Sequence, residues 1–481
     1  MKNVSRAHLE PYFELEQKAG VDIIRNWLGQ STEKTFFELA DKYGIMVWNG
    51  FWDSTQNFNA EAENPALFLK NARDVVLRFR NHPSIVLWCG RNEGVPQPII
   101  DNGLDKLIRT LDGTRYYTPS SNDINLQVIG PYDWQNPALY YTNLNRGFSV
   151  ETGSPSTSTL GSFKAWTPKP DRWPIDDVWA YHDWHQAGNG NTHSFMAALQ
   201  DMFGAPTSLR DFERKAQMLN YIDYRAIFEG MNAHLWQPNS GRLLWMDHPC
   251  WPSNMWEIYN YDYSAQASYY GVKKALQPLH AQLNIASGQV QIVNTTLDAH
   301  PSLAVTVHAY SLSNKLLFEK SAQVASPSNR VVTAFAINLA QIEIHGVALI
   351  ELTLAEPNGR QVSHDLYWLA ANMADYRALD RLPQATVEAT ALWTHANGSD
   401  TVIVHLHNVG PDVVLQQKLS LLDASGQRIL PAYYSSNYVS LLPGERQTIT
   451  IQYPATAATS PPRLTLYAWN LKQRNVAITQ Q

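Results

Sequence analysis

One stretch of the sequence decides the fold: Ser84-Ile85-Val86-Leu87-Trp88-Cys89-Gly90-Arg91-Asn92-Glu93-Gly94. Its apolar run contains branched residues and stands between a helix-like segment and a glycine, which is typical of a fully buried parallel strand. The run ends in Asn92 and Glu93. In α/β barrels the chemistry lies at the carboxyl ends of such strands. Glu93 is therefore the first candidate functional residue.

A second carboxylate, Glu151, follows a similar strand-like run at 147–150. Two carboxylates at the ends of two parallel strands of one barrel can face each other and divide acid–base and nucleophilic work between them. The alternative is that Glu93 and Glu151 are helix-capping or salt-bridged surface carboxylates. Their spacing alone does not separate the two interpretations.

Strand-like and helix-like segments alternate through the first half of the chain, which predicts βαβ units and a parallel sheet. Strands are expected around Ile23, Ile45, Ile85, Tyr116, Val128 (126–130), Phe148 (146–150) and Leu243. Helices are expected over 7–19, from a Ser31 cap to Tyr43, and over 64–81, 96–111, 209–232 and 264–283. The span 154–206 has no clear period and is expected to be a functional loop region.

Seven strands are one fewer than an α/β TIM (β/α)8 barrel needs. Because the chain opens on a helix, the missing strand would be the first, and Glu93 and Glu151 would end the fourth and seventh. From Gly288 onward short strands separated by turns predict two all-β immunoglobulin-like sandwiches. We therefore expect a multidomain chain, with a barrel over 1–284 and sandwiches over 285–372 and 373–481.

The composition of the sequence limits the classes of partner that the protein can bind. The 481 residues carry a formal charge of −6 and contain no Lys/Arg run, which argues against nucleic acid or an anionic membrane as a partner. No apolar stretch reaches the 18 residues of a membrane span. Cys89 and Cys250 both lie in or after apolar runs and are expected to be buried free thiols. A metal cluster is one interpretation of His182, Asp183, His185 and His193, but they lack a known zinc-ligand pattern and are expected in a solvated loop.

Several motifs share one resemblance. They are Ile24-Arg25-Asn26-Trp27, Asp41–Trp48, Gly90–Glu93, Gly130–Trp134, Val150–Gly153, and Trp245 followed by Trp251-Pro252-Ser253. In combination they resemble glycoside hydrolase family 2, in its β-mannosidase and exo-β-D-glucosaminidase branch. In the second half, Tyr269–Ala275, Asp375-Tyr376 and Tyr433–Tyr438 also resemble this branch. The resemblance covers nearly the whole chain.

The resemblance implies retaining hydrolysis of terminal β-linked hexosides by two carboxylates, without cofactor or metal. Glu93 would be the general acid/base, Glu151 the nucleophile, and Asn92 a hydrogen-bond partner of the sugar's 2-substituent. The sixteen Trp and 23 Tyr residues suit sugar stacking, although most are expected in cores. Further candidate substrate contacts, each of which could instead be structural, are Arg25, Trp27, Trp48, Tyr132, Trp245, Asp247, His248 and Trp251.

The sugar stays open between a β-mannoside and a β-glucosaminide. Asn92-Glu93 followed by Gly94-Val95-Pro96 looks mannosidase-like, whereas Gly204–Leu209 looks glucosaminidase-like. Family members carry two domains and a first barrel strand ahead of the part matched here, and any targeting signal would precede them. We expect a periplasmic or secreted location and leave the oligomeric state open. The alternatives are a non-catalytic carbohydrate-binding protein and a scaffold that binds partners through its sandwiches.

Overall fold

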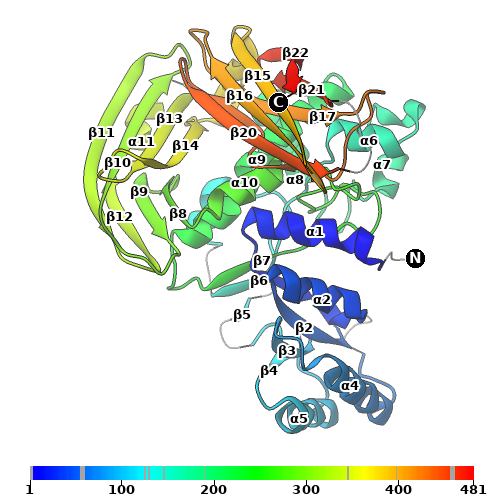
Figure 1. Ribbon diagram of the computed structural model, residues 1–481. Coiled ribbons are helices and arrows are strands. Elements are labelled where there is room, and N and C mark those ends of the chain that lie inside the picture. The colour runs from blue at the N-terminus through cyan, green and yellow to red at the C-terminus, as the bar shows by residue number, and fades with distance from the viewer. Residues whose placement is uncertain are drawn as a thin grey trace. The chain divides into compact units, whose positions relative to one another are not determined.

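The computed structural model in Figure 1 describes residues 4–54, 60–123, 126–127, 130–144, 147–188, 190–343, 346–396, 398–455 and 461–480. The chain forms two compact units. The first unit comprises Met1–Pro131, Arg146–Gly153 and Gln237–Met246, and the second comprises Tyr132–Asn145, Ser154–Trp236 and Asp247–Gln481. Each unit is described by itself.

The described residues of the first unit form seven parallel strands in two sheets, the number expected from the sequence. The sheet β1-β2-β3-β4 is formed by Ile23–Asn26, Met46–Asp53, Ile85–Arg91 and Tyr116–Ser120. The sheet β5-β6-β7 is formed by Leu126–Gln127, Phe148–Thr152 and Gly241–Leu244. Val128, Ile129 and Arg146, which the sequence assigned to strands, lie outside the described residues.

Both sheets of the first unit share a small apolar interior. Trp48, Cys89, Val150 and Leu243 are its buried members, contributed by β2, β3, β6 and β7. Side chains from all these strands fill the space between the sheets, as in the packed interior of a barrel. Cys89 is therefore a buried thiol, as expected, and burial raises its pKa to about 11.

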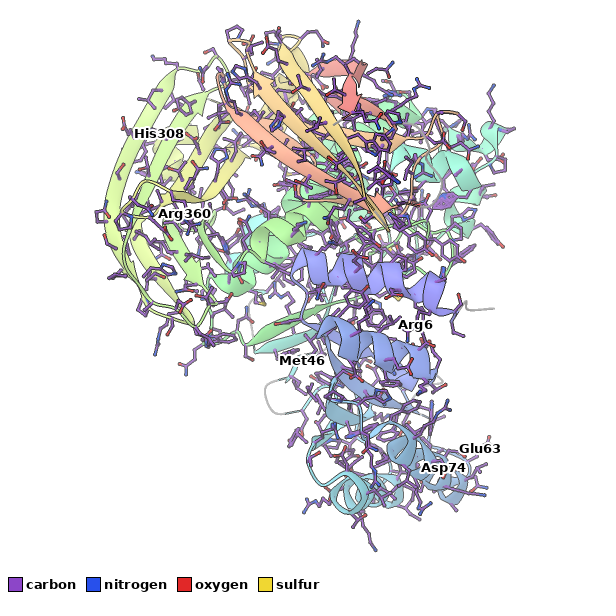
Figure 2. All side chains as sticks on the ribbon, viewed as in Figure 1. Arg6, Met46, Glu63, Asp74, His308 and Arg360 are labelled. Atoms are coloured by element: carbon purple, nitrogen blue, oxygen red, sulfur yellow. The ribbon has the colours of Figure 1, made fainter. Side chains whose placement is uncertain are left out.

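Four helices pack on the outside of the sheet β1-β2-β3-β4. They are α1 (Arg6–Ala19), α2 (Lys34–Tyr43), α4 (Pro65–Phe79) and α5 (Pro98–Leu107, extended by a π-helical turn to Asp112). Arg6, labelled in Figure 2, joins α1 to α2 through a 2.7 Å ion pair with Glu38. The predicted Ser31 cap is wrong, because α2 begins at Lys34 and Ser31 instead bonds to Asn26.

In the second unit, the predicted loop at 154–206 is wrong. The segment contains α6 (Leu160–Trp166), α7 (Asp177–Tyr181), α8 (His193–Phe203) and a 3-10 turn at Lys169–Arg172. Its aromatic residues, including Phe163, Trp179 and Phe195, are buried in one cluster. Short helices that bury aromatic residues on several sides lose the one-sided period on which the prediction relied.

Of the two long helices predicted for this unit, over 209–232 and 264–283, the structure confirms only the first. Helix α9 (Leu209–Asn232) is confirmed, with the Ser208 hydroxyl accepting from the amide of Asp211 at 3.2 Å. The helix predicted over 264–283 is wrong at both ends, because α10 spans only Ala267–Ala275. Pro278 cannot continue a helix, and Leu279–Leu283 forms strand β8.

Two β-sandwiches follow, as the sequence predicts. The first pairs the sheet β12-β9-β8 with β11-β10-β13-β14, and the second pairs β18-β20-β16-β15-β23 with β19-β17-β21-β22. The strands of the first are β8, β9 (Gln289–Asn294), β10 (His300–Ser311), β11 (Leu316–Ser326), β12 (Arg330–Ala336), β13 (Ala348–Ala355) and β14 (Gln361–Leu369), with α11 at Leu339–Glu343. Strand β8 (Leu279–Leu283) precedes residue 284 and belongs to this sandwich. The proposed domain boundaries at 284 and 372 stay predictions.

The second sandwich follows a 3-10 segment at Met373–Arg381. Its strands are β15 (Val387–Ala396), β16 (Ser399–Asn408), β17 (Val414–Leu422), β18 (Tyr433–Tyr434), β19 (Val439–Leu441), β20 (Arg446–Pro454), β21 (Arg463–Ala468), β22 (Leu471–Val476) and β23 (Ile478–Gln480). Among the described residues, no helix has the length and apolar character needed to cross a membrane.

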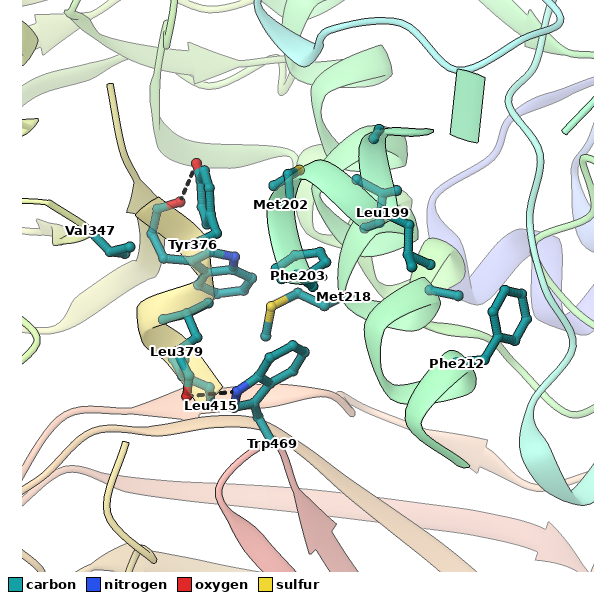
Figure 3. Packing of buried hydrophobic residues seen from close by; sticks show 14 of the residues in the cluster. Leu199, Met202, Phe203, Phe212, Met218, Val347, Tyr376, Leu379, Leu415 and Trp469 are labelled. Atoms are coloured by element: carbon teal, nitrogen blue, oxygen red, sulfur yellow. Dashed lines mark hydrogen bonds between the residues drawn. The ribbon is translucent and has the colours of Figure 1, made fainter. Parts of the chain in front are cut away.

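Helices and sandwiches of the second unit share one core (Figure 3). Phe203 of α8 packs against Trp469 of the second sandwich, with ring centroids 5.3 Å apart. The indole N–H of Trp469 donates to the carbonyl of Leu379 at 2.9 Å, and the Tyr376 hydroxyl donates to the carbonyl of Trp368 at 3.2 Å. The sandwiches are therefore anchored to α8 and α9 through buried contacts.

Candidate active site

Three strands of the first unit bring a cation, an amide and a carboxylate together. Arg25 lies on β1, Asn92 follows β3, and Glu151 lies near the end of β6. The Nη1 atom of Arg25 donates to Oε1 of Glu151 at 2.5 Å, and Nη2 donates to Oδ1 of Asn92 at 2.6 Å. All three side chains are largely buried. We call this arrangement the Arg25–Asn92–Glu151 triad.

The interior of the first unit holds Arg25 in place. Arg25 is the register partner of Trp48 on β2, and its guanidinium lies over the Trp48 ring, 5.6 Å from the centroid. Trp48 is only 2% exposed and belongs to the apolar interior. Of the two interpretations of Trp48, sugar contact and packing, its burial supports packing.

Glu93 has a different environment from Glu151. Its side chain is exposed, whereas that of Glu151 is buried. Its backbone is left-handed, with φ at 61°, and its N–H donates to the Ser121 hydroxyl at 2.9 Å. A non-glycine residue in this region costs on the order of 1–3 kcal/mol and persists only where surrounding contacts hold it, as often at functional sites.

Ser121 is a residue that the sequence reasoning missed. Its hydroxyl accepts from the N–H of Glu93 and donates to Oδ1 of Asn92 at 3.3 Å, so one buried side chain fixes both neighbours. Ser121 directly follows β4. The rule that polar residues at the carboxyl ends of parallel strands gather at one edge would have identified it.

Trp27 and Trp245 form an aromatic pair beside these residues. Trp27 follows β1, Trp245 follows β7, and their rings meet edge to face with centroids 5.1 Å apart. The amide of Trp245 donates to the carbonyl of Thr152 at 2.9 Å, next to Glu151 in the chain. Both side chains are half-buried, which leaves part of each indole available for contact.

Four other predicted residues, Tyr132, Asp247, His248 and Trp251, belong to the second unit and are half-buried there. Trp256 donates from its indole N–H to the carbonyl of Tyr132 at 2.9 Å. The structure thus brings Arg25, Trp27, Trp48, Asn92, Glu93, Glu151 and Trp245 into one unit, and the roles of the other four stay predictions.

Trp251 packs on a histidine that was expected to be solvated. Its ring stacks on His182 at 5.1 Å, and its N–H donates to Asp183 at 3.2 Å. The expectation of a solvated loop is therefore wrong for His182, whose Nδ1 also lies 2.7 Å from the carbonyl of Pro252. The expected burial of Cys250 is wrong as well, because that thiol is exposed.

Comparison with known proteins identifies two domains. Residues 29–163 match the family model "Glycosyl hydrolases family 2, TIM barrel domain", and residues 365–471 match the "Exo-beta-D-glucosaminidase Ig-fold domain". The mannosylglycoprotein endo-β-mannosidase of Lilium longiflorum is 26% identical, over 95% of this chain and 60% of that protein. The exo-β-D-glucosaminidase of Streptomyces avermitilis is 28% identical, over 92% of this chain and 54% of that protein.

Solved structures agree with this fold. The exo-chitosanase CsxA of Amycolatopsis orientalis superposes with a TM-score of 0.89 at 24% identity, covering 98% of this chain and 62% of that one. The β-D-mannosidase of Dictyoglomus thermophilum superposes with a TM-score of 0.78 at 22% identity, covering 98% of this chain and 58% of that one. The expected class, a TIM barrel followed by immunoglobulin-like sandwiches, is confirmed. The chain spans 54% to 60% of the length of the two relatives named above.

Proposed function

Since the chain belongs to glycoside hydrolase family 2, we propose that it carries the catalytic residues of a retaining β-glycosidase. The proposed substrates are terminal β-linked hexosides, either β-mannosides or β-glucosaminides. Relatives named for each of these sugars support both. The observation that carries the proposal is the Arg25–Asn92–Glu151 triad. Its Asn92 is followed directly in the chain by Glu93, whose carboxylate is exposed.

In the proposed reaction Glu151 attacks the anomeric carbon while Glu93 donates its proton to the leaving glycosidic oxygen. The bond between the anomeric carbon and that oxygen breaks, and a glycosyl ester of Glu151 forms. Glu93, now ionised, takes a proton from water, and the resulting nucleophile displaces Glu151 from the anomeric carbon. Two inversions give net retention of configuration.

The environments of the two carboxylates fit these roles. A guanidinium 2.5 Å from Glu151 stabilises its ionised form, which is the form that a nucleophile needs. The same contact orients the carboxylate of Glu151 through its Oε1 atom. Glu93 lies outside this buried network, with its side chain exposed, so its carboxyl group can reach a leaving oxygen and water.

Asn92 is suited to bind the 2-substituent of the sugar. Both contacts that the described residues make with its side chain use Oδ1, which accepts from Arg25 and from Ser121. The amide Nδ2 is therefore the donor that remains for a ligand. A hydrogen bond to the sugar at this position can strengthen in the oxocarbenium-like transition state.

The test measures hydrolysis of aryl β-mannosides and aryl β-glucosaminides by the full chain. Glu93→Gln should lower kcat/KM by roughly 10²- to 10⁴-fold, and Glu151→Gln by at least about 10³-fold. Glu63→Gln is the matched control, because Glu63 is an exposed carboxylate on the first unit (Figure 2). Proton NMR of the first product should show the β-anomer.

Three outcomes would contradict the proposal in whole or in part. Glycan binding without product release would favour a carbohydrate-binding protein. Neither binding nor turnover would favour a scaffold. Near-normal turnover in Glu151→Gln would remove Glu151 from the role of nucleophile while leaving the family assignment intact.

A further inference from the structure

Three side chains of the types that ligate metals lie close together, far along the chain from the candidate active site. Glu351 lies on β13, His364 on β14, and Glu445 directly before β20. Oε1 of Glu351 is 3.1 Å from Nε2 of His364, and Oε1 of Glu445 is 2.9 Å from the same nitrogen. All three ligand atoms lie within 4.8 Å of one another. We propose that these residues bind one Zn²⁺ ion, which joins the two sandwiches.

The sheet register presents two of the ligands on one face. On β13, Ile350 and Leu352 are buried in the core of the first sandwich, so Glu351 between them points to the opposite face. His364 points to the same face, because it is the register partner of Thr353, two residues after Glu351. His308 on β10, labelled in Figure 2, is the register partner of Glu351 itself. Glu445 comes from the second sandwich. Because its ligands come from both sandwiches, a bound ion would link the two domains.

Each carboxylate is already oriented for binding. Oε2 of Glu445 accepts from the amide of Leu442 at 2.5 Å, and Oε2 of Glu351 lies 3.2 Å from Nδ1 of His308. One oxygen of each group is thus held by the protein, and the other faces His364. Outer hydrogen bonds of this kind orient ligating carboxylates in metal sites.

Hydrogen bonding alone satisfies this cluster poorly. The Nε2 atom of His364 can carry one proton, yet two carboxylate oxygens approach it. Two carboxylates in one site also repel each other. A divalent cation at the centre would contact the ligand atoms of Glu351, His364 and Glu445 and neutralise both carboxylate charges. A single proton on His364 carries only one positive charge and neutralises them less completely.

The chemistry of the ligands favours zinc. One imidazole nitrogen and two carboxylate oxygens suit Zn²⁺, which binds both at about 2.0–2.2 Å and keeps a fourth position for water. The separations of 2.9 and 3.1 Å are compatible with ligand atoms around one ion of that size. The side chains of the three ligands are 13–22% exposed, so an ion can enter from solvent.

A proton competes with the metal for His364. Burial lowers the pKa of His364, but the hydrogen bonds that its ring donates to Glu351 and Glu445 outweigh burial and raise the pKa to about 9. Zn²⁺ must displace that proton. Other charged or titratable groups near the cluster are His308, Glu319, Tyr310, Lys274 and Asp365.

The experiment is calorimetric titration of Zn²⁺ into the chelator-treated full chain, with Cys250→Ser as background to remove the exposed thiol. One Zn²⁺ per chain should bind. Glu445→Gln and His364→Gln should each weaken binding at least about tenfold. Glu319→Gln is the control, because Glu319 lies on the neighbouring strand β11, where its Oε1 is 3.6 Å from Nε2 of His308. Equal binding in all variants, or none in the parent, would overturn the site.

Crystals soaked in Zn²⁺ provide a test that needs no variant. An anomalous difference peak at the zinc edge should lie about 2.0–2.2 Å from Nε2 of His364 and from one oxygen of Glu351 and of Glu445. The absence of a peak at this position, with density for a direct His364–Glu445 contact, would show that the cluster is an ion pair only.

Discussion

Arg25 and Glu151, 126 positions apart in the sequence, form a buried ion pair. Their closest atoms are 2.5 Å apart, and their side chains are 8% and 4% exposed. Removing one member of such a pair leaves an uncompensated buried charge, which is strongly unfavourable. Since Arg25 also donates to Asn92, one guanidinium sets the positions of two proposed active-site groups.

Arg25→Lys should lower kcat by roughly 10²-fold or more, with a smaller change in KM. Lysine keeps the charge but lacks the planar fork that donates to Glu151 and Asn92 at once. Steady-state kinetics on an aryl β-glycoside measures this. Arg109→Lys, which alters an exposed ion pair with Asp105, should leave kcat unchanged. Equal kcat in Arg25→Lys and Arg109→Lys would show that the fork is not needed.

Ser121→Ala should lower kcat about 5- to 30-fold without unfolding the protein. The change removes the acceptor for the N–H of Glu93 and a donor to Asn92, and a lost buried hydrogen bond costs about 1–3 kcal/mol. Because the serine positions Glu93, the acid and base limbs of the pH–rate profile should shift as well. A fall in thermal stability with an unchanged profile and kcat would assign Ser121 a purely structural role.

Asp223→Asn should stabilise the protein at pH 8 and have little effect at pH 4. Burial raises the pKa of Asp223 from 3.8 to about 7, and this effect outweighs a hydrogen bond from the Ser154 side chain, which lowers the pKa. The unfolded chain therefore loses this proton near pH 4 while the folded protein keeps it until about pH 7. Stability falls as pH rises through that window, by at most about 4 kcal/mol, and stays low above it. Asparagine does not ionise and avoids this loss.

Thermal unfolding of Asp223→Asn and the parent at both pH values measures the difference. Asp74→Asn, at an exposed position of the first unit (Figure 2), is the control and should show the same difference at pH 4 and pH 8. A stabilisation by Asp223→Asn that is equal at the two pH values would rule out ionisation as its cause.

Trp469→Ala should destabilise the second unit by about 3–5 kcal/mol. The indole is buried between Phe203 and Leu379, and the guanidinium of Arg214 lies 4.0 Å from its ring centroid. Chemical denaturation followed by near-ultraviolet circular dichroism measures the loss. Leu297→Ala, at a position that is 91% exposed, should leave the transition unchanged. A loss confined to the C-terminal sandwich, with α8 and α9 unaffected, would contradict a shared core.

The strand ends were the predictable part of this molecule. Glu93, Asn92 and Glu151 could be found because parallel strands align their carboxyl ends at one edge, so local runs report a shared location. The contacts of Arg25 with Glu151 and Asn92 could not be predicted from sequence spacing. Whether the Arg25 side chain reaches both residues depends on how the strands curve around the interior. The same rule applies to Ser121, which directly follows β4.

The remaining differences also have physical causes. Strand β8 contains His280 and Gln282, polar residues that are fully buried, so no alternation of apolar and polar positions marks it. The cluster of Glu351, His364 and Glu445 spans two domains. Because the three residues are far apart in the sequence, no short motif predicts such a site. Trp48 is of a residue type that often contacts sugars, and the sequence alone could not distinguish this role from packing. Its burial in the structure supports packing inside the barrel.

The central claim, that Glu151 is the nucleophile, is tested most directly by trapping the glycosyl-enzyme. A 2-deoxy-2-fluoro β-glycoside with an activated aryl leaving group slows breakdown of the intermediate more than its formation. Peptide mass spectrometry should then find the fluorosugar as an ester on Glu151, and no ester in Glu151→Gln. A label on Glu93 or on any other residue, or hydrolysis with no label at all, would contradict the account.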